Sequence, residues 1–136
     1  MAKIYETFVV NEGGTSGHIE TEDGLRLEVS SPTDPSRTGP NPEQFMGMAW
    51  STCLNATMRA IMKAQKIDAE SKVRVEVSFN KQDSGFGYYF TMDAYASIEG
   101  MSEAETLKLV EQAHKRCPVS LLIEKNPHVH VHAETY

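Results

Sequence analysis

The chain has 136 residues, of which 40% are hydrophobic and 24% charged, a composition typical of one globular domain spanning residues 1–136. Its formal net charge is −6 at pH 7, and no cluster of lysine and arginine is longer than two residues, which argues against nucleic acid or an anionic membrane as a partner. No segment approaches the ~20 apolar residues of a membrane-spanning helix, and the N-terminus lacks the pattern of a secretory signal, so we expect a soluble cytoplasmic protein.

The first third of the chain has the pattern of short β-strands. Residues 4–10 are rich in β-branched and aromatic side chains, and the glycines of the NEGG segment after them favour a turn. In residues 18–30, apolar and polar side chains alternate around an Asp23-Gly24 turn, which is typical of a hairpin. These patterns predict three short antiparallel strands. The SSPTDPSRTGP segment that follows predicts a polar loop within the domain.

A helix is predicted from Pro42 to about residue 66. Asn41 is a favourable N-cap, Pro42 suits the first helical position, and the carboxylate of Glu43 suits the positive end of the helix dipole. Apolar side chains occupy nearly every face of its first half, which an exposed helix does not tolerate. We therefore expect a buried central helix. Its apolar residues are Phe45, Met46, Met48, Ala49, Trp50, Cys53, Leu54 and Ala56.

The second half of the chain predicts a long hairpin, a helix and a last strand. Two alternating segments, residues 73–79 and 90–98, flank the glycine-bearing DSGFG turn. Ser102 and Glu105 form the sequence of a capping box, which predicts the start of a helix. Residues 128–136 predict a final strand. The expected fold class is α+β, with an antiparallel sheet wrapped around the central helix.

The two cysteines are explained either by core packing or by redox chemistry. Cys53 lies in an apolar segment, where burial raises the pKa of a thiol, so an inert core cysteine is the simpler interpretation. Cys117 precedes Pro118 and is expected at the cap of a short helix, where free backbone N–H groups favour a thiolate. Lys115 and Arg116 add positive charge beside it. From position alone, redox chemistry and packing explain Cys117 equally well.

The histidines give a weaker signal. His128, His130 and His132 share one face of the last predicted strand, a geometry that can hold a metal ion. The valines between them make an ordinary half-buried strand the better interpretation. We expect no metal and no other cofactor. His114 is explained as a cation in the last turn of a helix and is left out of the site.

Two motifs together carry a family resemblance. NPEQ stands at the start of the central helix, with Glu43 ten residues before Cys53, and CPVS places Cys117 after a capped helix. With the order of elements along essentially the whole chain, this pattern resembles the osmotically inducible and organic hydroperoxide resistance proteins, a family of thiol-dependent peroxidases. The resemblance implies an OsmC/Ohr-like α+β fold, with antiparallel sheets wrapped around a long buried central helix in an intertwined homodimer.

The same resemblance implies roles for the site residues. Cys53 is expected to be the peroxidatic cysteine, Cys117 the resolving cysteine that joins it in an intramolecular disulfide, and Glu43 the active-site carboxylate. The implied substrate is an organic hydroperoxide, the implied reductant an external dithiol, and the implied setting an oxidative stress response. No cofactor is needed for this chemistry.

The chain departs from the family at the active-site arginine. In the hydroperoxide-resistance branch an arginine follows the first GG turn and pairs with the glutamate, but Thr15 stands there in this sequence. Arg37, just before GPNPEQ, is the first candidate to replace it, and Arg26 is the second. An arginine is needed because an unpaired Glu43 carboxylate beside Cys53 opposes thiolate formation, which a guanidinium offsets.

A second class of function stays open at this stage. The chain is also compatible with an apolar-ligand binding protein, or with an acyl-thioester hydrolase that wraps a sheet on a central helix. In that case the cysteines are incidental, and Glu43 is the candidate for activating water in a hydrolase.

Glu43 and Cys53 cannot meet within one straight helix. Ten residues separate them, which corresponds to ~15 Å along a helix axis. Either the helix breaks near Gly47, a poor helix former, or Glu43 of one subunit approaches Cys53 of the other across a two-fold axis. The family's intertwined dimer favours the second arrangement, and we expect a homodimer with composite sites.

Overall fold

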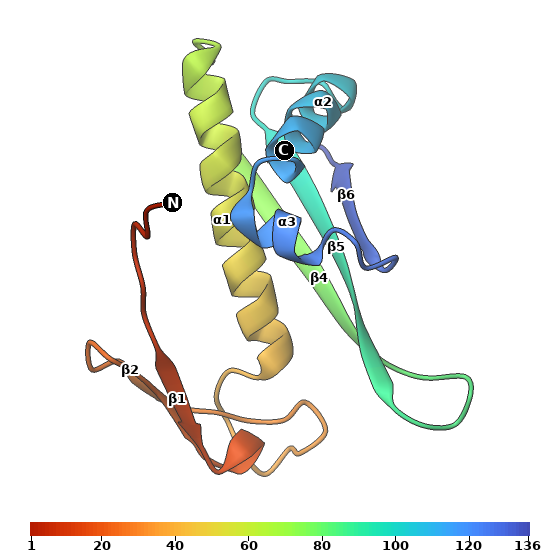
Figure 1. Ribbon diagram of the computed structural model, residues 1–136. Helices are drawn as coiled ribbons and strands as arrows, with labels where there is room; N and C mark the ends of the chain where they lie inside the picture. The colour runs from red at the N-terminus through yellow and green to blue at the C-terminus, as the bar shows by residue number, and fades with distance from the viewer. The chain divides into compact units, whose positions relative to one another are not determined.

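The computed structural model describes residues 1–136 and consists of two compact units, Met1–Phe45 and Met46–Tyr136. Figure 1 shows its helices and strands and labels most of them. The α+β class expected from the sequence is confirmed, with two three-stranded sheets. No helix combines the length and the apolar character that crossing a membrane requires.

The first unit contains the three short antiparallel strands that the sequence predicts. They are β1 (Val9–Glu12), β2 (His18–Thr21) and β3 (Arg26–Glu28), in the order β1-β2-β3, with the 3-10 turn η1 (Gly14–Ser16) between the first two. β1 begins at Val9 and not at residue 4, because its partner strand β2 already ends at Thr21, the residue paired with Val9. Residues 4–8 therefore have no strand to pair with.

The polar loop of residues 31–40 is closed onto the end of β3. The backbone N–H of Ser30 donates to the carbonyl of Pro40 at 3.1 Å, and its hydroxyl donates to the carbonyl of Gly39 at 2.6 Å. Gly39 has φ 129°, and a Cβ on it would lie 2.3 Å from the carbonyl oxygen of Glu28. Glycine is therefore required where the loop turns back to deliver the chain to the first helix.

Helix α1 (Pro42–Ala64) begins where the sequence predicts and is continuous. Asn41 Oδ1 accepts a hydrogen bond from the backbone N–H of Gln44 at 2.9 Å, and the Gln44 side chain accepts one from the backbone N–H of Asn41 at 3.0 Å. The helix continues through Gly47, so the alternative in which a break at that residue brings Glu43 to Cys53 is wrong. A single glycine costs only ~1 kcal/mol relative to alanine, and tertiary packing of the helix offsets such a cost.

The second unit contains a mixed sheet of β4 (Ser71–Lys81), β5 (Tyr88–Ile98) and β6 (Val129–Ala133), in the order β4-β5-β6. β4 and β5 form the predicted antiparallel hairpin. The expectation of a wholly antiparallel sheet is wrong for β6, which pairs with β5 in parallel. The reason is the connection, because a chain that returns through two helices can cross to the opposite end of the sheet before it enters the next strand.

Those two helices are α2 (Glu103–His114) and α3 (Pro118–Ile123). The capping box predicted for α2 is confirmed, since the backbone N–H of Glu105 donates to Ser102 Oγ at 3.2 Å and the backbone N–H of Ser102 donates to Glu105 Oε2 at 3.3 Å. α2 ends at His114, and α3 begins immediately after Cys117.

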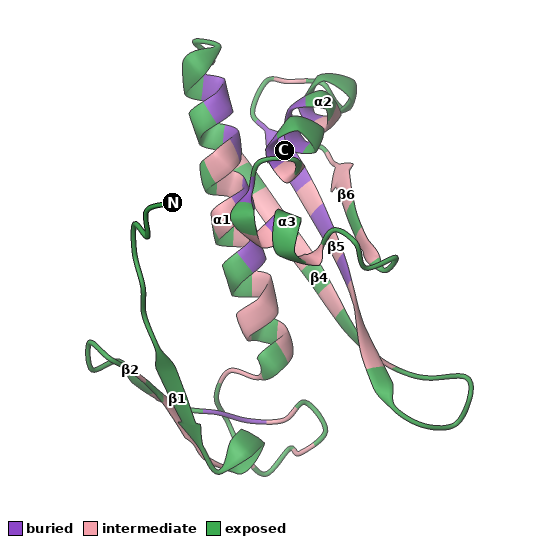
Figure 2. Cartoon of the chain, viewed as in Figure 1, coloured by how far each residue is buried: buried purple, intermediate pink, exposed green.

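The core of the second unit lies between the helices and the inner face of the sheet. Figure 2 shows buried residues along α1, α2 and β5, whereas β1 of the first unit is exposed. Alternate residues of β5 are buried, as the sequence pattern predicts. The buried core residues of this unit are Trp50, Leu54, Met58, Ile61, Met62, Met92, Ala94, Ala96, Ile98, Leu109, Val110, Ala113 and Cys117.

We expect Leu54→Ala to lower the free energy of unfolding by about 3 kcal/mol, because Leu54 is fully buried and its truncation leaves a cavity. The matched control is Leu122→Ala on α3, which removes the same atoms from a side chain that is 84% exposed and should change stability by less than ~0.5 kcal/mol. Urea unfolding of the two variants measures the difference. Similar losses in both would contradict the position of Leu54 in the core.

Candidate active site

Cys53 lies in the middle of α1, on the face that packs against the core. The residue is half-buried and packs against the apolar core. Of the apolar residues around it in sequence, Trp50 and Leu54 are fully buried and hold α1 in the core. The expectation of burial is wrong for Met48, Ala49 and Ala56, which are exposed because only one face of α1 packs against the core of this chain. Burial of the helix thus fixes the position of the thiol.

Cys117 is fully buried and occupies the cap position that the sequence predicts. The backbone turns after α2, where the N–H of Cys117 donates to the carbonyl of Ala113 at 2.8 Å. Pro118 then begins α3, and the Cys117 sulfur accepts a hydrogen bond from the backbone N–H of Ser120 at 3.4 Å. The local sequence therefore orients this sulfur toward free N–H groups at the start of a helix.

The fold brings the two sulfurs together. Cys53 Sγ and Cys117 Sγ are 3.1 Å apart, although 64 positions separate the residues in the sequence. Both thiols are free, and a disulfide bond is about 2.05 Å long, so the pair requires a movement of only about 1 Å to become a disulfide. This geometry permits intramolecular thiol–disulfide chemistry.

The surroundings of Cys53 favour the thiol over the thiolate. Burial raises the pKa of Cys53, and the neighbouring Cys117 thiol raises it further, while a hydrogen bond from the backbone N–H of Val119 opposes the increase. None of these groups is a cation. A low-pKa thiolate at Cys53 therefore needs positive charge in addition to these groups.

Trp50 and Ser120, which the sequence analysis did not place in the site, lie beside the cysteines. The indole Nε1–H of Trp50 donates to Ser120 Oγ at 2.8 Å, and both side chains are fully buried. The signal that could have identified them is spacing, since Trp50 stands three residues before Cys53 and Ser120 three residues after Cys117. Residues at this spacing share a helix face.

His114 also lies closer to the site than expected from its place in the last turn of α2. Its ring is 6.1 Å from that of Trp50, and its Nδ1 atom is buried without a hydrogen-bond partner. Burial lowers the pKa of His114, and the charge of Glu124 opposes this shift. At neutral pH His114 is therefore an uncharged packing neighbour of Trp50.

Glu43 lies in the first turn of α1, ten residues before Cys53 on the same continuous helix. Its Oε2 atom is buried without a hydrogen-bond partner. A buried carboxylate oxygen without a hydrogen bond is costly, and no hydrogen bond of this chain reaches Glu43 Oε2.

The two arginines that could replace the family's active-site arginine, Arg37 and Arg26, lie in the first unit, and neither forms a hydrogen bond with Glu43. Arg37 donates from Nε to the carbonyl of Val29 at 3.2 Å, and from Nη2 to the carbonyl of Gly17 at 3.0 Å and to the Glu28 carboxylate at 3.4 Å. None of these bonds reaches Glu43. Arg26 is an exposed residue of β3, and Thr15 is exposed in η1.

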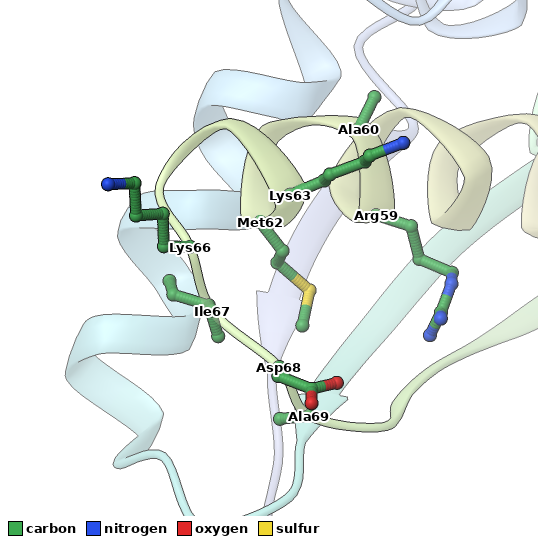
Figure 3. A pocket seen from close by; sticks show the side chains of 8 residues that line it. All are labelled: Arg59, Ala60, Met62, Lys63, Lys66, Ile67, Asp68 and Ala69. Atoms are coloured by element: carbon green, nitrogen blue, oxygen red, sulfur yellow. The ribbon is translucent and has the colours of Figure 1, made fainter.

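Two pockets of the second unit include residues of α1. The larger, of about 510 Å³, surrounds the C-terminal turn of α1 and the loop after it, and Figure 3 shows its basic side chains Arg59, Lys63 and Lys66. The smaller, of about 390 Å³, is mainly apolar and includes residues of α3. It is lined by Met46, Tyr89, Phe90, Met92, Leu122, Ile123, Asn126 and Val129.

The histidines of β6 lie over β5. His132 Nε2 is 2.7 Å from Asp93 Oδ1, and His130 Nδ1 is 3.6 Å from the same oxygen. The His132 ring also stacks on Tyr95, with centroids 4.7 Å apart. The fold thus gives these side chains partners within the sheet.

A family model and the sequence relatives of this chain indicate the same protein family. A family model described as OsmC-like protein matches residues 33–132. The organic hydroperoxide resistance protein-like 2 of Staphylococcus epidermidis is 31% identical over 122 residues, which cover 86% of each chain. The organic hydroperoxide resistance protein OhrB of Bacillus subtilis is 28% identical over 120 residues, which cover 86% of this chain and 88% of OhrB.

Solved structures agree with the sequence matches. The crystal structure of B. subtilis OhrB superposes with a TM-score of 0.86 at 26% identity, covering 98% of this chain and 100% of OhrB. An organic hydroperoxide resistance protein OsmC from Legionella pneumophila gives a TM-score of 0.84 at 29% identity, covering 98% of each chain. The OsmC/Ohr-like fold expected from the sequence is therefore confirmed, and this chain belongs to the OsmC-like protein family.

Proposed function

We propose that this protein is a thiol-dependent peroxidase that reduces organic hydroperoxides, with Cys53 as the peroxidatic and Cys117 as the resolving cysteine. The observation that carries the proposal is the 3.1 Å separation of the two sulfurs, which two unrelated segments of the chain create. The names of the relatives support the substrate class, since they are organic hydroperoxide resistance proteins.

The proposed reaction has two oxidative steps. The Cys53 thiolate attacks one peroxide oxygen and becomes a sulfenic acid, and the other oxygen leaves with a proton as the alcohol. The Cys117 sulfur then attacks the Cys53 sulfur, the disulfide forms, and water leaves. An external dithiol restores both thiols and is itself oxidised to a disulfide. These steps require only the two cysteines, the peroxide and the reductant.

The smaller pocket supports an apolar hydroperoxide as substrate. Its lining is mainly aliphatic, aromatic and methionine side chains, which suit a hydrocarbon tail. The pocket is lined in part by Leu122 and Ile123 of α3, the short helix that Cys117 caps.

We further propose that Arg37 and Glu43 tune Cys53. Burial raises the pKa of Cys53, so a peroxidatic role needs a cation that favours the thiolate. The observed bonds of Arg37 use Nε and Nη2, which leaves Nη1 for a carboxylate. A guanidinium that holds Glu43 near the thiol would both neutralise the carboxylate and stabilise the thiolate.

The remaining part of the proposal is a homodimer with composite sites. Glu43 and Cys53 share one continuous helix, ten residues apart, so they do not meet within it. The buried Glu43 Oε2 atom without a partner supports a donor from another subunit. A two-fold axis between α1 helices would bring Glu43 of one protomer to Cys53 of its partner.

Treatment with cumene hydroperoxide should consume both thiols of each chain and lower the intact mass by two hydrogens, because the two sulfurs are in contact. Peptide mapping should find Cys53 joined to Cys117. In the Cys117→Ser control, Cys53 should gain oxygen and form no intramolecular disulfide. Separate over-oxidation of both wild-type cysteines would contradict the two-cysteine mechanism, and loss of no thiol would favour a hydrolase or a ligand-binding protein.

Arg37→Ala should raise the pKa of Cys53, because it removes the cation proposed to offset burial. Below the pKa, each unit of increase lowers the thiolate fraction about tenfold, and peroxide consumption at pH 7 should slow in proportion. The pH dependence of Cys53 alkylation by iodoacetamide, in a Cys117→Ser background, measures the midpoint. Arg26→Ala is the matched control and should leave the midpoint unchanged. Equal midpoints for Arg37→Ala and its parent would remove Arg37 from the site.

Subunits carrying Glu43→Ala and subunits carrying Cys53→Ser, mixed through denaturation and refolding, should regain activity, because each heterodimer holds one site with both residues intact. Random pairing predicts about a quarter of the wild-type activity. Replacing the second partner with the Glu43→Ala/Cys53→Ser double variant leaves no intact site and should give no recovery. Inactive but verified heterodimers in the first mixture would exclude a composite site.

A further inference from the structure

Helices α1 and α3 are joined at two points that lie one helical turn apart. One is the contact between Cys53 and Cys117, and the other is the hydrogen bond between Trp50 and Ser120. Trp50 precedes Cys53 by three residues, whereas Ser120 follows Cys117 by three, so the order is reversed on the two helices. Residues three apart share a helix face, and the two contacts therefore fix the register of α3 against α1.

The Trp50–Ser120 bond is connected directly to the resolving cysteine. Trp50 Nε1–H donates to Ser120 Oγ at 2.8 Å, and the backbone N–H of Ser120 donates to Cys117 Sγ at 3.4 Å. Both side chains have no exposed surface, so water cannot replace either partner of the indole bond. A buried indole N–H or hydroxyl without a partner is strongly unfavourable, so breaking the Trp50–Ser120 hydrogen bond is costly.

α3 depends on such a link for its position. It has only six residues, and a helix this short is not stable by itself in water. Leu121 and Leu122 are exposed, so its apolar contact with the core comes from Val119 and Ile123. The Trp50–Ser120 bond adds a directional restraint to this small contact.

We propose that Trp50 and Ser120 are positioning residues that hold Cys117 against Cys53 and thereby set the rate of disulfide formation. This inference rests on the proposed peroxidase function. In the step concerned, the Cys117 sulfur displaces the hydroxyl of the Cys53 sulfenic acid, the sulfur–sulfur bond forms, and water leaves with the thiol proton. The sulfurs must approach from 3.1 Å to about 2.05 Å, and a displaced α3 makes this approach rare.

The first oxidative step depends less on this link. It uses the Cys53 sulfur and the peroxide, and the contribution of α3 to that sulfur is the Val119 N–H, which opposes the larger effect of burial on the pKa of Cys53. Loss of the Trp50–Ser120 bond should therefore slow sulfenic acid formation about threefold at most, whereas disulfide formation should slow about ten- to hundredfold. The two steps separate a positioning role from general damage to the fold.

The test compares Ser120→Ala and Trp50→Phe with the wild type after mixing with cumene hydroperoxide. Trapping with dimedone measures sulfenic acid formation, and quenched mass analysis measures the disulfide. Ser51→Ala is the matched control, because its hydroxyl lies next to Trp50 in α1 but bonds the Met48 carbonyl of the same helix at 3.3 Å. The double variant Trp50→Phe/Ser120→Ala should be no slower than the slower single variant, since both remove one bond.

Two readouts do not depend on how a variant alters activity. The disulfide of each variant should be reduced more easily by a glutathione buffer, and a tenfold lower equilibrium constant corresponds to a potential about 30 mV higher. The chain has a single tryptophan, so its indole N–H gives one NMR signal, which should exchange slowly with solvent in the wild type. If a variant fails to fold, the exchange rate of the indole N–H in the wild type still shows whether the Trp50–Ser120 hydrogen bond is stably formed.

The outcomes distinguish the inference from the proposed function. If the wild type forms no disulfide with the hydroperoxide, the proposed function fails and the inference fails with it. If the wild type forms the disulfide but both variants form it at the wild-type rate, or lose both steps equally, the inference alone is overturned. Fast exchange of the Trp50 indole proton would also overturn it.

Discussion

The contact between the Cys53 and Cys117 sulfurs is the constraint on which the rest of the site depends. It requires that the middle of α1 meets the start of α3, two segments that the β4–β5 hairpin and α2 separate along the chain. The buried faces of α1, α2 and β5 supply the packing that maintains this meeting. Core packing and the proposed redox chemistry, which compete as explanations when the sequence alone is considered, thus involve the same residues.

Burial creates the main electrostatic problem of the site. The apolar packing that brings Cys53 to Cys117 also raises the pKa of Cys53, and the N–H of Val119 only opposes this effect. A reactive thiolate therefore needs charge from outside the apolar contact. In the proposed site, the unpaired Glu43 oxygen and the Nη1 atom of Arg37 would be complementary groups, which would give the departure at Thr15 a physical interpretation. The arginine can come from a different loop, provided that its guanidinium reaches the same carboxylate.

The sequence predicts the parts of this site that depend on local chemistry. Asn41 and Ser102 identify the starts of α1 and α2, and Cys117 before Pro118 identifies the cap of α3. The parts that it does not predict depend on residues far apart in the chain. The parallel pairing of β6 follows from where the connection crosses the sheet, and the Trp50–Ser120 bond joins residues 70 positions apart. No local propensity encodes either feature, although the family resemblance identifies Cys53, whose local surroundings indicate only packing.

The start of α3 also bears on the proposed formation of a disulfide between the two sulfurs. The backbone N–H of Ser120 donates to the Cys117 sulfur at 3.4 Å. A disulfide sulfur keeps lone pairs, so this N–H group retains its acceptor after oxidation. The sulfurs need to approach by only about 1 Å, which rotation of the side chains can supply without unwinding either helix. A fixed pair of helices is therefore better suited to this site than a mobile loop, because the geometry that favours disulfide formation is already present in the reduced protein.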